Sequence, residues 1–256
     1  MKEFLGFGGY TREAEGFLSW QHLSFVTALM AVMVLLAVLL GRKNRCADLS
    51  CKRRVLVVTA LLIDALEIFK ITVLCLRSES WEPILFNLPL FLCSIQLITI
   101  PMAAFCKGRV QAAALDFVSI FGILGAVLGT YGAGNNYGSY PVISLDNVVS
   151  GLTHTISGFA ALYIMIAGMA ALEKKNMPIT FGILTGFCLL AWVANPILDS
   201  NYMFLVRGDG TPYDILFILV GGSPVLYPVS VVALFFVYIA GFYGIHHLTR
   251  KKAASR

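Results

Sequence analysis

Residues 55–76 read VLVVTALLIDALEIFKITVLCL, an apolar run of 22 residues that contains three ionisable side chains. A helix rises about 1.5 Å per residue, so about 20 apolar residues cross the hydrocarbon core of a bilayer. We therefore expect this run to span a membrane. Ionisable groups at that depth are costly, and they usually mark a function or a buried ion pair.

The same pattern recurs along the chain. The sequence is 58% hydrophobic and only 13% charged, whereas a soluble domain averages about 25% charged residues. A soluble protein, a disordered chain and a disulfide-stapled secreted module are thereby excluded. Alternating segments typical of a β-barrel are absent, so an all-α bundle of seven transmembrane helices in one domain, residues 1–256, is predicted. The expected spans are 21–40, 55–76, 84–105, 113–130, 148–172, 179–198 and 224–246.

The distribution of basic residues predicts the orientation of the chain. Lys and Arg near span ends are retained on the cytoplasmic side, which favours an N-terminus outside and a cytoplasmic C-terminus. The net charge of +5 is then explained by loops that face anionic lipid, and no nucleic-acid partner is expected. The plasma membrane of a bacterial cell is the expected location. Fourteen of the 19 basic residues fall on the predicted cytoplasmic side: Arg42, Lys43, Arg45, Lys52, Arg53, Arg54, Lys107, Arg109, Lys174, Lys175, Arg250, Lys251, Lys252 and Arg256.

Reactive side chains of three spans lie at similar depths. Measured from the outer ends of their helices, Lys70, Glu67 and Asp64 are roughly 9, 14 and 18 Å deep. The same measure gives roughly 13 Å for Cys93 and roughly 12 Å for His154. The sequence thus predicts that polar groups converge in the outer half of the bundle.

Three further polar side chains are expected near this level, closer to the outer surface. They are His22 on the first span, and Asn195 and Asn201 around the end of the sixth span. The two amides are candidate donors to a substrate. No metal site is expected, because His22, His154 and Glu67 lie on three helices without diagnostic ligand spacing. No other cofactor is expected either.

Glu67 and Lys70 are three residues apart on one helix, so they share a face and can form an ion pair. Two interpretations remain open. The pair either neutralises itself between packed helices and fixes their register, or it lines a wet cavity and orients the chemistry there.

Cys93 and His154 form a candidate nucleophile and general base. A thiolate is the attacking species, and a neighbouring imidazole generates it. The natural reaction of such a pair is acyl transfer through a thioester. Alternatively, His154 forms a hydrogen bond between packed helices. Two further motifs, Gly125-x-x-x-Gly129 and Gly182-x-x-x-Gly186, predict close helix packing.

Several motifs resemble the YwaF family of bacterial integral membrane proteins, to which transmembrane protein 164 of animals is similar. The similarity covers about residues 17–227, and it implies a seven-span fold. For the animal branch it also implies acyl transfer between phospholipids, with the motif cysteine at Cys93, the histidine at His154 and the motif asparagine at Asn201. The motifs are FLSWQHL at 17–23, LPLFLCSI at 88–95, SGLTH at 150–154 and NYMFL at 201–205.

One position departs from the family pattern. The bacterial motif usually reads Leu-Pro-Leu-His-Leu-Cys, whereas this chain has Phe91 at the histidine position.

The leading hypothesis for the function is a lipid acyltransferase whose phospholipid substrates enter from the outer leaflet. The alternatives are a transporter or ligand-binding receptor with a polar outer pocket, and a structural subunit whose buried charges specify packing.

Overall fold

The computed structural model describes residues 1–170 and 172–254. Arg256 of the predicted cytoplasmic cluster lies outside the described residues, as do the side chains of Arg250, Lys251 and Lys252. The described part of the chain is helical and has no strand. Its elements are α1 (Lys2–Leu5), α2 (Trp20–Asn44), α3 (Leu49–Ser78), α4 (Glu82–Phe86), α5 (Gln96–Phe105), α6 (Gly108–Tyr131), α7 (Gly134–Ser139), α8 (Leu145–Ile166), α9 (Met177–Leu198), the short 3₁₀ helix η1 (Tyr202–Phe204), α10 (Asp214–Leu219) and α11 (Leu226–Ala254).

The all-α class predicted from the apolar runs is confirmed. In the described part of the chain, five helices are long and apolar enough to cross a membrane: α2, α6 with its continuation α7, α8, α9 and α11. A further helix, α3, is 30 residues long and carries Asp64, Glu67 and Lys70 in its middle.

The predicted helix over 84–105 is wrong as one continuous element. It is divided into α4 and α5 by an irregular segment, Asn87–Ile95. Pro89 explains the break, because proline lacks an N–H group and disfavours helical backbone in the residue before it. Irregular backbone at membrane depth is tolerated where protein buries it or where it lines a cavity. The break therefore marks a place to look for a site.

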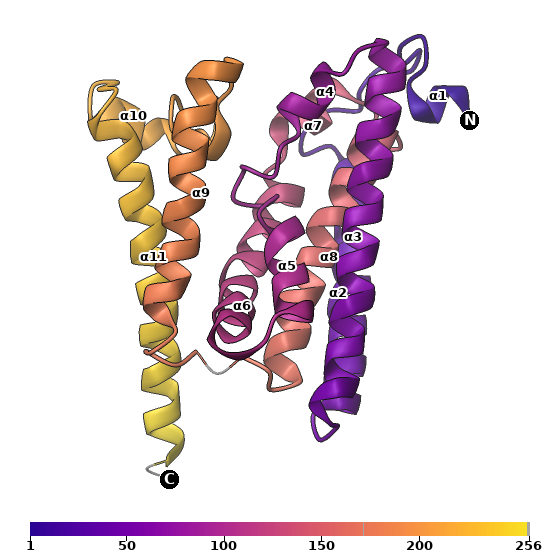
Figure 1. Ribbon diagram of the computed structural model, residues 1–256. Coiled ribbons are helices and arrows are strands. Elements are labelled where there is room, and N and C mark those ends of the chain that lie inside the picture. Colours follow the sequence, from indigo (N-terminus) through magenta and orange to yellow (C-terminus); the bar gives the residue numbers. More distant parts are fainter. Residues whose placement is uncertain (171, 255–256) are drawn as a thin grey trace.

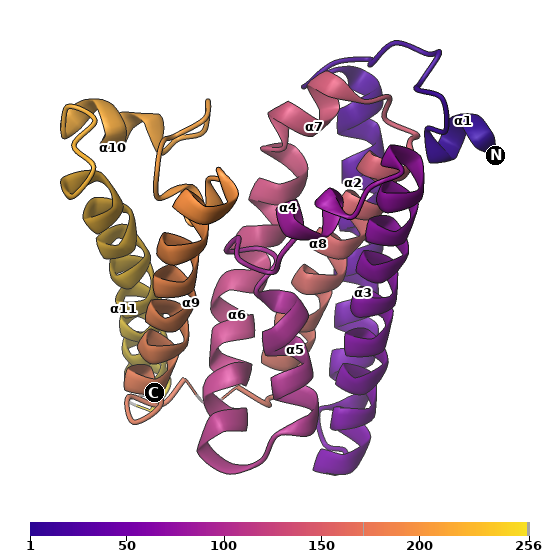
Figure 2. The ribbon, with the colours of Figure 1, turned by 45° about the horizontal axis from the view of Figure 1, so that its top comes forward.

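The helices form a bundle around α6 and α8, which make the most extensive contact with each other (Figure 1). The helix α2 packs on α8, and α5 lies between α3 and α6. The hairpin of α9 and α11 contacts the rest of the bundle through α6 (Figure 2).

Small residues set the distance between α6 and α8. A Cβ added at Gly122 would lie 2.7 Å from the carbonyl oxygen of Ser157, so nothing larger than glycine fits there. The two glycines of the other motif, Gly182 and Gly186 on α9, have nothing within 4 Å of an added Cβ. Close packing at this second motif, which the spacing had predicted, is thus not found.

The connections that carry the basic residues share one end of the bundle. The turns between α2 and α3, between α5 and α6, and between α8 and α9 lie at the lower end in Figure 1. The N-terminus, α4, α7 and α10 lie at the upper end. The arrangement of the helices therefore agrees with the grouping of Lys and Arg.

A buried carboxylate at the lower end joins the α9–α11 hairpin to α6. Asp116 of α6 is fully buried. Its Oδ1 accepts a hydrogen bond from the backbone N–H of Leu172 at 3.0 Å. Its Oδ2 accepts bonds from Asn176 Nδ2 at 3.0 Å and from the Tyr243 hydroxyl of α11 at 2.9 Å. One side chain thus fixes three segments of the chain.

At the upper end, an ion pair joins α3 to α8, and a hydrogen bond from Tyr10 ties the N-terminal segment to it. Arg77 at the end of α3 contacts both carboxylate oxygens of Asp146 on α8, at 2.9 and 3.1 Å. The Tyr10 hydroxyl donates to the same carboxylate at 2.6 Å. Burial, reinforced by this bond, raises the pKa of Tyr10, so its hydroxyl remains a donor at neutral pH.

Arg77→Gln is expected to destabilise the fold by about 2 kcal/mol, because it leaves the Asp146 carboxylate largely buried without its charged partner. Arg12→Gln is the matched control, since Arg12 is half exposed and lies 3.7 Å from Glu15. Such an exposed pair contributes less than about 1 kcal/mol. Thermal unfolding of both variants in detergent measures the difference, and equal transition temperatures would contradict the structural role of Arg77.

Candidate functional site

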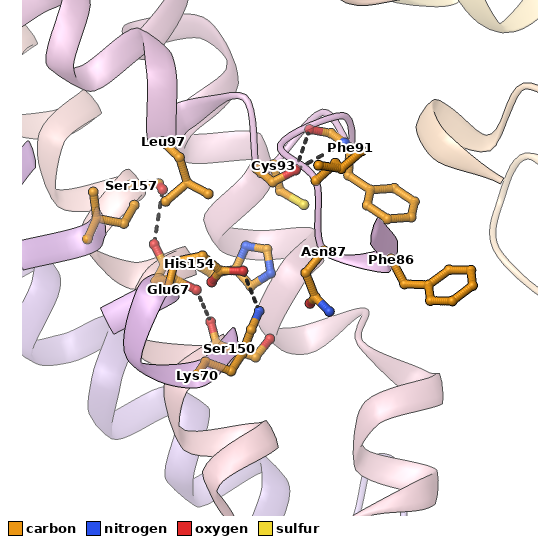
Figure 3. Close-up of a pocket in the computed structure, with 14 residues that line it drawn as sticks. Glu67, Lys70, Phe86, Asn87, Phe91, Cys93, Leu97, Ser150, His154 and Ser157 are labelled. Carbon is orange, nitrogen blue, oxygen red and sulfur yellow. Dashed lines mark hydrogen bonds and ion pairs between the residues drawn. The ribbon is translucent and has the colours of Figure 1, made fainter. Parts of the chain in front are cut away.

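A cavity of about 130 Å³ lies beside the break between α4 and α5. Its walls come from α3, from the break with the first turn of α5, and from α8 (Figure 3). The lining residues are Ile63, Glu67, Lys70, Phe86, Asn87, Leu88, Phe91, Cys93, Ser94, Leu97, Ser150, Thr153, His154 and Ser157. Four of the predicted site residues are therefore in one place: Glu67, Lys70, Cys93 and His154.

Hydrogen bonds within the break hold Cys93 against the cavity. The backbone N–H of Phe91 donates to Ser94 Oγ at 3.0 Å, and this hydroxyl donates back to the Phe91 carbonyl at 3.1 Å. On the other side, the Asn87 side chain donates to the Pro83 carbonyl at 2.8 Å, which closes the end of α4. The break is thus an ordered turn that presents a half-buried thiol.

His154 belongs to a polar stripe on α8. Ser150, Thr153, His154 and Ser157 follow i, i+3, i+4 and i+7 spacing, which places them on one helix face. The hydroxyls of Thr153 and Ser157 donate to carbonyls one turn back. Within the described residues, neither nitrogen of the His154 ring has a hydrogen-bond partner. The imidazole is therefore free to accept a proton from a group in the cavity.

Two glycines of α6, Gly125 and Gly129, lie next to Cys93 and His154. A Cβ at Gly125 would lie 3.7 Å from the Cβ of Cys93. A Cβ at Gly129 would overlap the ring of His154. Positions four apart on a helix are about 6 Å apart, so Cys93 and His154 lie over adjacent positions of α6. Gly129 thus makes room for the His154 ring, whereas at Gly125 a methyl group would make only an ordinary contact with Cys93.

The charged wall of the cavity comes from α3. Lys70 Nζ lies 2.6 Å from Glu67 Oε1, and the two side chains are 17% and 13% exposed. Lys70 lines the same cavity as Cys93 and His154. Figure 3 shows the imidazole between the Cys93 thiol and the Lys70 amino group. The predicted ion pair is present, and it lines the cavity.

Two other predicted residues lie away from this cavity. His22 is fully buried; its Nδ1 accepts from the Leu18 N–H at 3.1 Å, and its Nε2 lies 3.1 Å from the Thr130 carbonyl. The ring stacks on Tyr137. Asp64 does not line the cavity, and its buried Oδ1 has no hydrogen-bond partner among the described side chains.

The two asparagines hold the loop after α9. Asn195 donates to the Tyr202 carbonyl at 3.1 Å and accepts from the Tyr202 N–H at 2.7 Å. Asn201 donates to the Arg207 carbonyl and to Asp209. Neither asparagine lines the cavity, and the amides of both form hydrogen bonds within the loop. The depth predicted from the sequence did not show that these two amides belong to a loop and not to the site.

Phe91, at the position of the family histidine, packs into an aromatic cluster. Its ring centroid lies 5.0 Å from that of Tyr202 and 5.8 Å from that of Phe204. The Tyr202 hydroxyl donates to the carbonyl of Leu85 next to the break. Phe91 therefore joins the loop after α9 to the cavity wall, which explains why an apolar ring is accommodated here.

Several lining residues were missed from the sequence, chiefly Asn87, Ser94, Ser150, Thr153 and Ser157. The helical spacing of the α8 hydroxyls with His154 was a usable signal, whereas nothing in the sequence indicated Asn87. Among the described residues, no three His, Cys, Asp or Glu side chains come together as metal ligands.

Comparison with known proteins identifies a family. A family model described as the TMEM164 family matches residues 17–244. No curated protein and no solved structure matches the chain. The similarity to transmembrane protein 164 that the motifs suggested is confirmed, and the apolar helices agree with a membrane protein.

Proposed function

Since this chain belongs to the TMEM164 family, we propose that it is an integral membrane acyltransferase that moves acyl groups between phospholipids through a thioester on Cys93. The supporting observation is that Cys93 and His154 line one cavity, and that the His154 imidazole has no hydrogen-bond partner among the described residues. A thiol and a base at one cavity are the minimal equipment for nucleophilic acyl transfer.

The proposal includes a topology. The chain crosses the membrane seven times, with α3 as one crossing and α4 with α5 as another. The N-terminus is outside and the C-terminus is cytoplasmic, because the basic connections share one end of the bundle. The cavity then lies in the outer half of the bilayer. The bacterial cell membrane is the proposed location.

The first half-reaction forms the thioester. His154 accepts the proton of the Cys93 thiol, and the thiolate attacks the ester carbonyl carbon of a donor phospholipid. The tetrahedral intermediate collapses with cleavage of the ester C–O bond. The leaving oxygen of the lysophospholipid takes the proton from His154.

The second half-reaction releases the acyl group. The hydroxyl of an acceptor lysophospholipid gives its proton to His154 and attacks the thioester carbonyl. The C–S bond breaks, and the Cys93 sulfur regains the proton from His154. Both half-reactions use the same two residues, so no cofactor is required for the balance of atoms and electrons.

The test is covalent capture of the acyl-enzyme. Purified protein in lipid nanodiscs is incubated with a phospholipid that carries a labelled acyl chain. We expect a label on the protein that neutral hydroxylamine removes, as it does from a thioester, and a mass increase of one acyl group on the Cys93 peptide.

Cys93→Ala is expected to remove this label completely, whereas Cys188→Ala, the matched control at a buried cysteine outside the cavity, is expected to keep it. Label that survives Cys93→Ala would contradict the thioester mechanism. Reversible binding of lipid or solute without any covalent label would favour a transporter or receptor instead.

A further inference from the structure

Lys70 takes no part in the two half-reactions, which need only a nucleophile and a base. Within the described residues that line the cavity, it is the only cation. Its ion pair with Glu67 belongs to a single helix, so it joins no two helices together. A packing role between helices therefore does not explain why the pair faces a cavity.

We propose that Lys70 binds the phosphodiester of the substrate lipid, and that Glu67 is the counter-ion which occupies Lys70 while the cavity is empty. This inference rests on the proposed function, since it assigns the residue that binds the phosphate of the substrate at the same site. A phosphodiester is a single anion, which an ammonium group matches as a point charge.

The surroundings of the cavity select for an anion that is attached to an apolar body. Phe86, at the end of α4, is 51% exposed, and its neighbour Leu85 is 45% exposed. Phe86 itself lines the cavity, so a group bound there contacts an apolar side chain as well as Lys70. A free hydrated anion gains nothing from that contact, whereas a lipid replaces bilayer contacts with similar contacts on the protein.

The size of the cavity fits the polar centre of a lipid. A volume of about 130 Å³ accommodates several groups of the size of water, which suits a glycerol unit with its phosphate but excludes two acyl chains. One glycerol unit separates the ester carbonyl from the phosphate. Lys70 and Cys93 line the same small cavity, so one lipid can reach both.

Glu67 then has a role that a structural ion pair would not have. When the phosphodiester arrives, it competes with Glu67 for Lys70. Removal of the carboxylate charge should therefore strengthen lipid binding. If the pair only neutralised a buried charge, the same change would leave Lys70 without a partner and would weaken the protein.

The experiment measures binding in a Cys93→Ala background, where no covalent chemistry occurs. The probes are dihexanoylphosphatidylcholine and dihexanoylglycerol, its analogue without phosphate, and native mass spectrometry of detergent-solubilised protein gives each Kd. We expect Lys70→Gln to raise the Kd for the phospholipid by about tenfold, the loss of roughly 1.4 kcal/mol. The Kd for the glycerol analogue should rise much less, so the ratio of the two constants changes.

Glu67→Gln is expected to lower the Kd for the phospholipid severalfold, and Lys70→Arg to keep the ratio of the parent. The double variant with both glutamines, which has no unpaired charge, keeps the test valid if either single variant fails to fold; its ratio should match that of Lys70→Gln. Inorganic phosphate at millimolar concentration should displace neither probe.

Equal weakening of both probes by Lys70→Gln, or no weakening of either, would overturn the inference. Displacement of the phospholipid by inorganic phosphate would also overturn it and assign the site to a free anion. These outcomes are independent of the acyl-enzyme assay, so a protein that binds the phospholipid through Lys70 but forms no thioester refutes only the proposed function.

Discussion

Gly129→Ala is expected to lower the rate of acyl-enzyme formation on Cys93 by about 10²- to 10³-fold while the helical bundle remains folded. The added Cβ would occupy the space of the His154 ring. This ring is the end of a side chain, so it can move away from α6 without a shift of the backbone. The general base is then displaced from the cavity, so we expect the rate to fall without a comparable loss of stability.

Two glycine variants serve as controls for Gly129→Ala. Gly182→Ala adds a methyl group where nothing lies within 4 Å, so both rate and stability should match the parent. Gly125→Ala places the methyl group 3.7 Å from Cys93, an ordinary contact, and should retain most of the rate. Acyl-enzyme formation and thermal unfolding are measured for all three variants. A full rate in Gly129→Ala would show that His154 is not needed where the structure places it.

Asp116→Ala is expected to destabilise the protein by about 3 kcal/mol, the largest effect on stability that we predict. Its carboxylate accepts hydrogen bonds from Leu172, Asn176 and Tyr243. The truncation leaves the Leu172 N–H and the Asn176 amide without this acceptor, whereas the Tyr243 hydroxyl keeps Thr180 Oγ1 at 3.0 Å. For a domain of this size the transition temperature should fall by roughly 6–12 °C. Thermal unfolding in detergent micelles measures this shift.

Two comparisons isolate the role of Asp116. Tyr243→Phe removes one of the three donors and should cost about 1 kcal/mol or less, since Asp116 keeps two bonds. Asp48→Ala makes the same chemical change at an exposed residue whose side chain makes no capping bond. If Asp116→Ala and Asp48→Ala unfolded at the same temperature, the carboxylate would not join the α9–α11 hairpin to α6.

Much of the fold was predictable, because the length and hydropathy of each run depend on that run alone. The apolar runs located α2, α6, α8, α9 and α11. The apolar run with charged side chains at Asp64, Glu67 and Lys70 located α3. The break at Asn87–Ile95 was not predicted. A proline inside an apolar run is compatible with either a kinked helix or a broken one, and the surrounding protein decides between them.

The candidate site was predictable in part for the same reason. Depth follows from the number of residues to the end of a helix, and it placed Glu67 and Lys70 of α3 and His154 of α8 at similar depths. Cys93 lies in the break between α4 and α5, where the rise of a helix does not apply, and it reaches the cavity through the tertiary structure. His22, Asn195 and Asn201 were expected near the same level, yet their side chains form hydrogen bonds with backbone groups outside the cavity. Depth alone does not distinguish these two groups of residues.

The sequence by itself determined where Glu67, Lys70 and His154 lie along their helices, because the rise of a helix is fixed by its own hydrogen bonds. Only the tertiary structure decided which of them face one another. The rotation of each helix about its axis depends on how neighbours pack, and here Gly122 and Gly129 allow close approach at α6. That packing turns Cys93 and His154 toward one cavity, and no single segment contains this information.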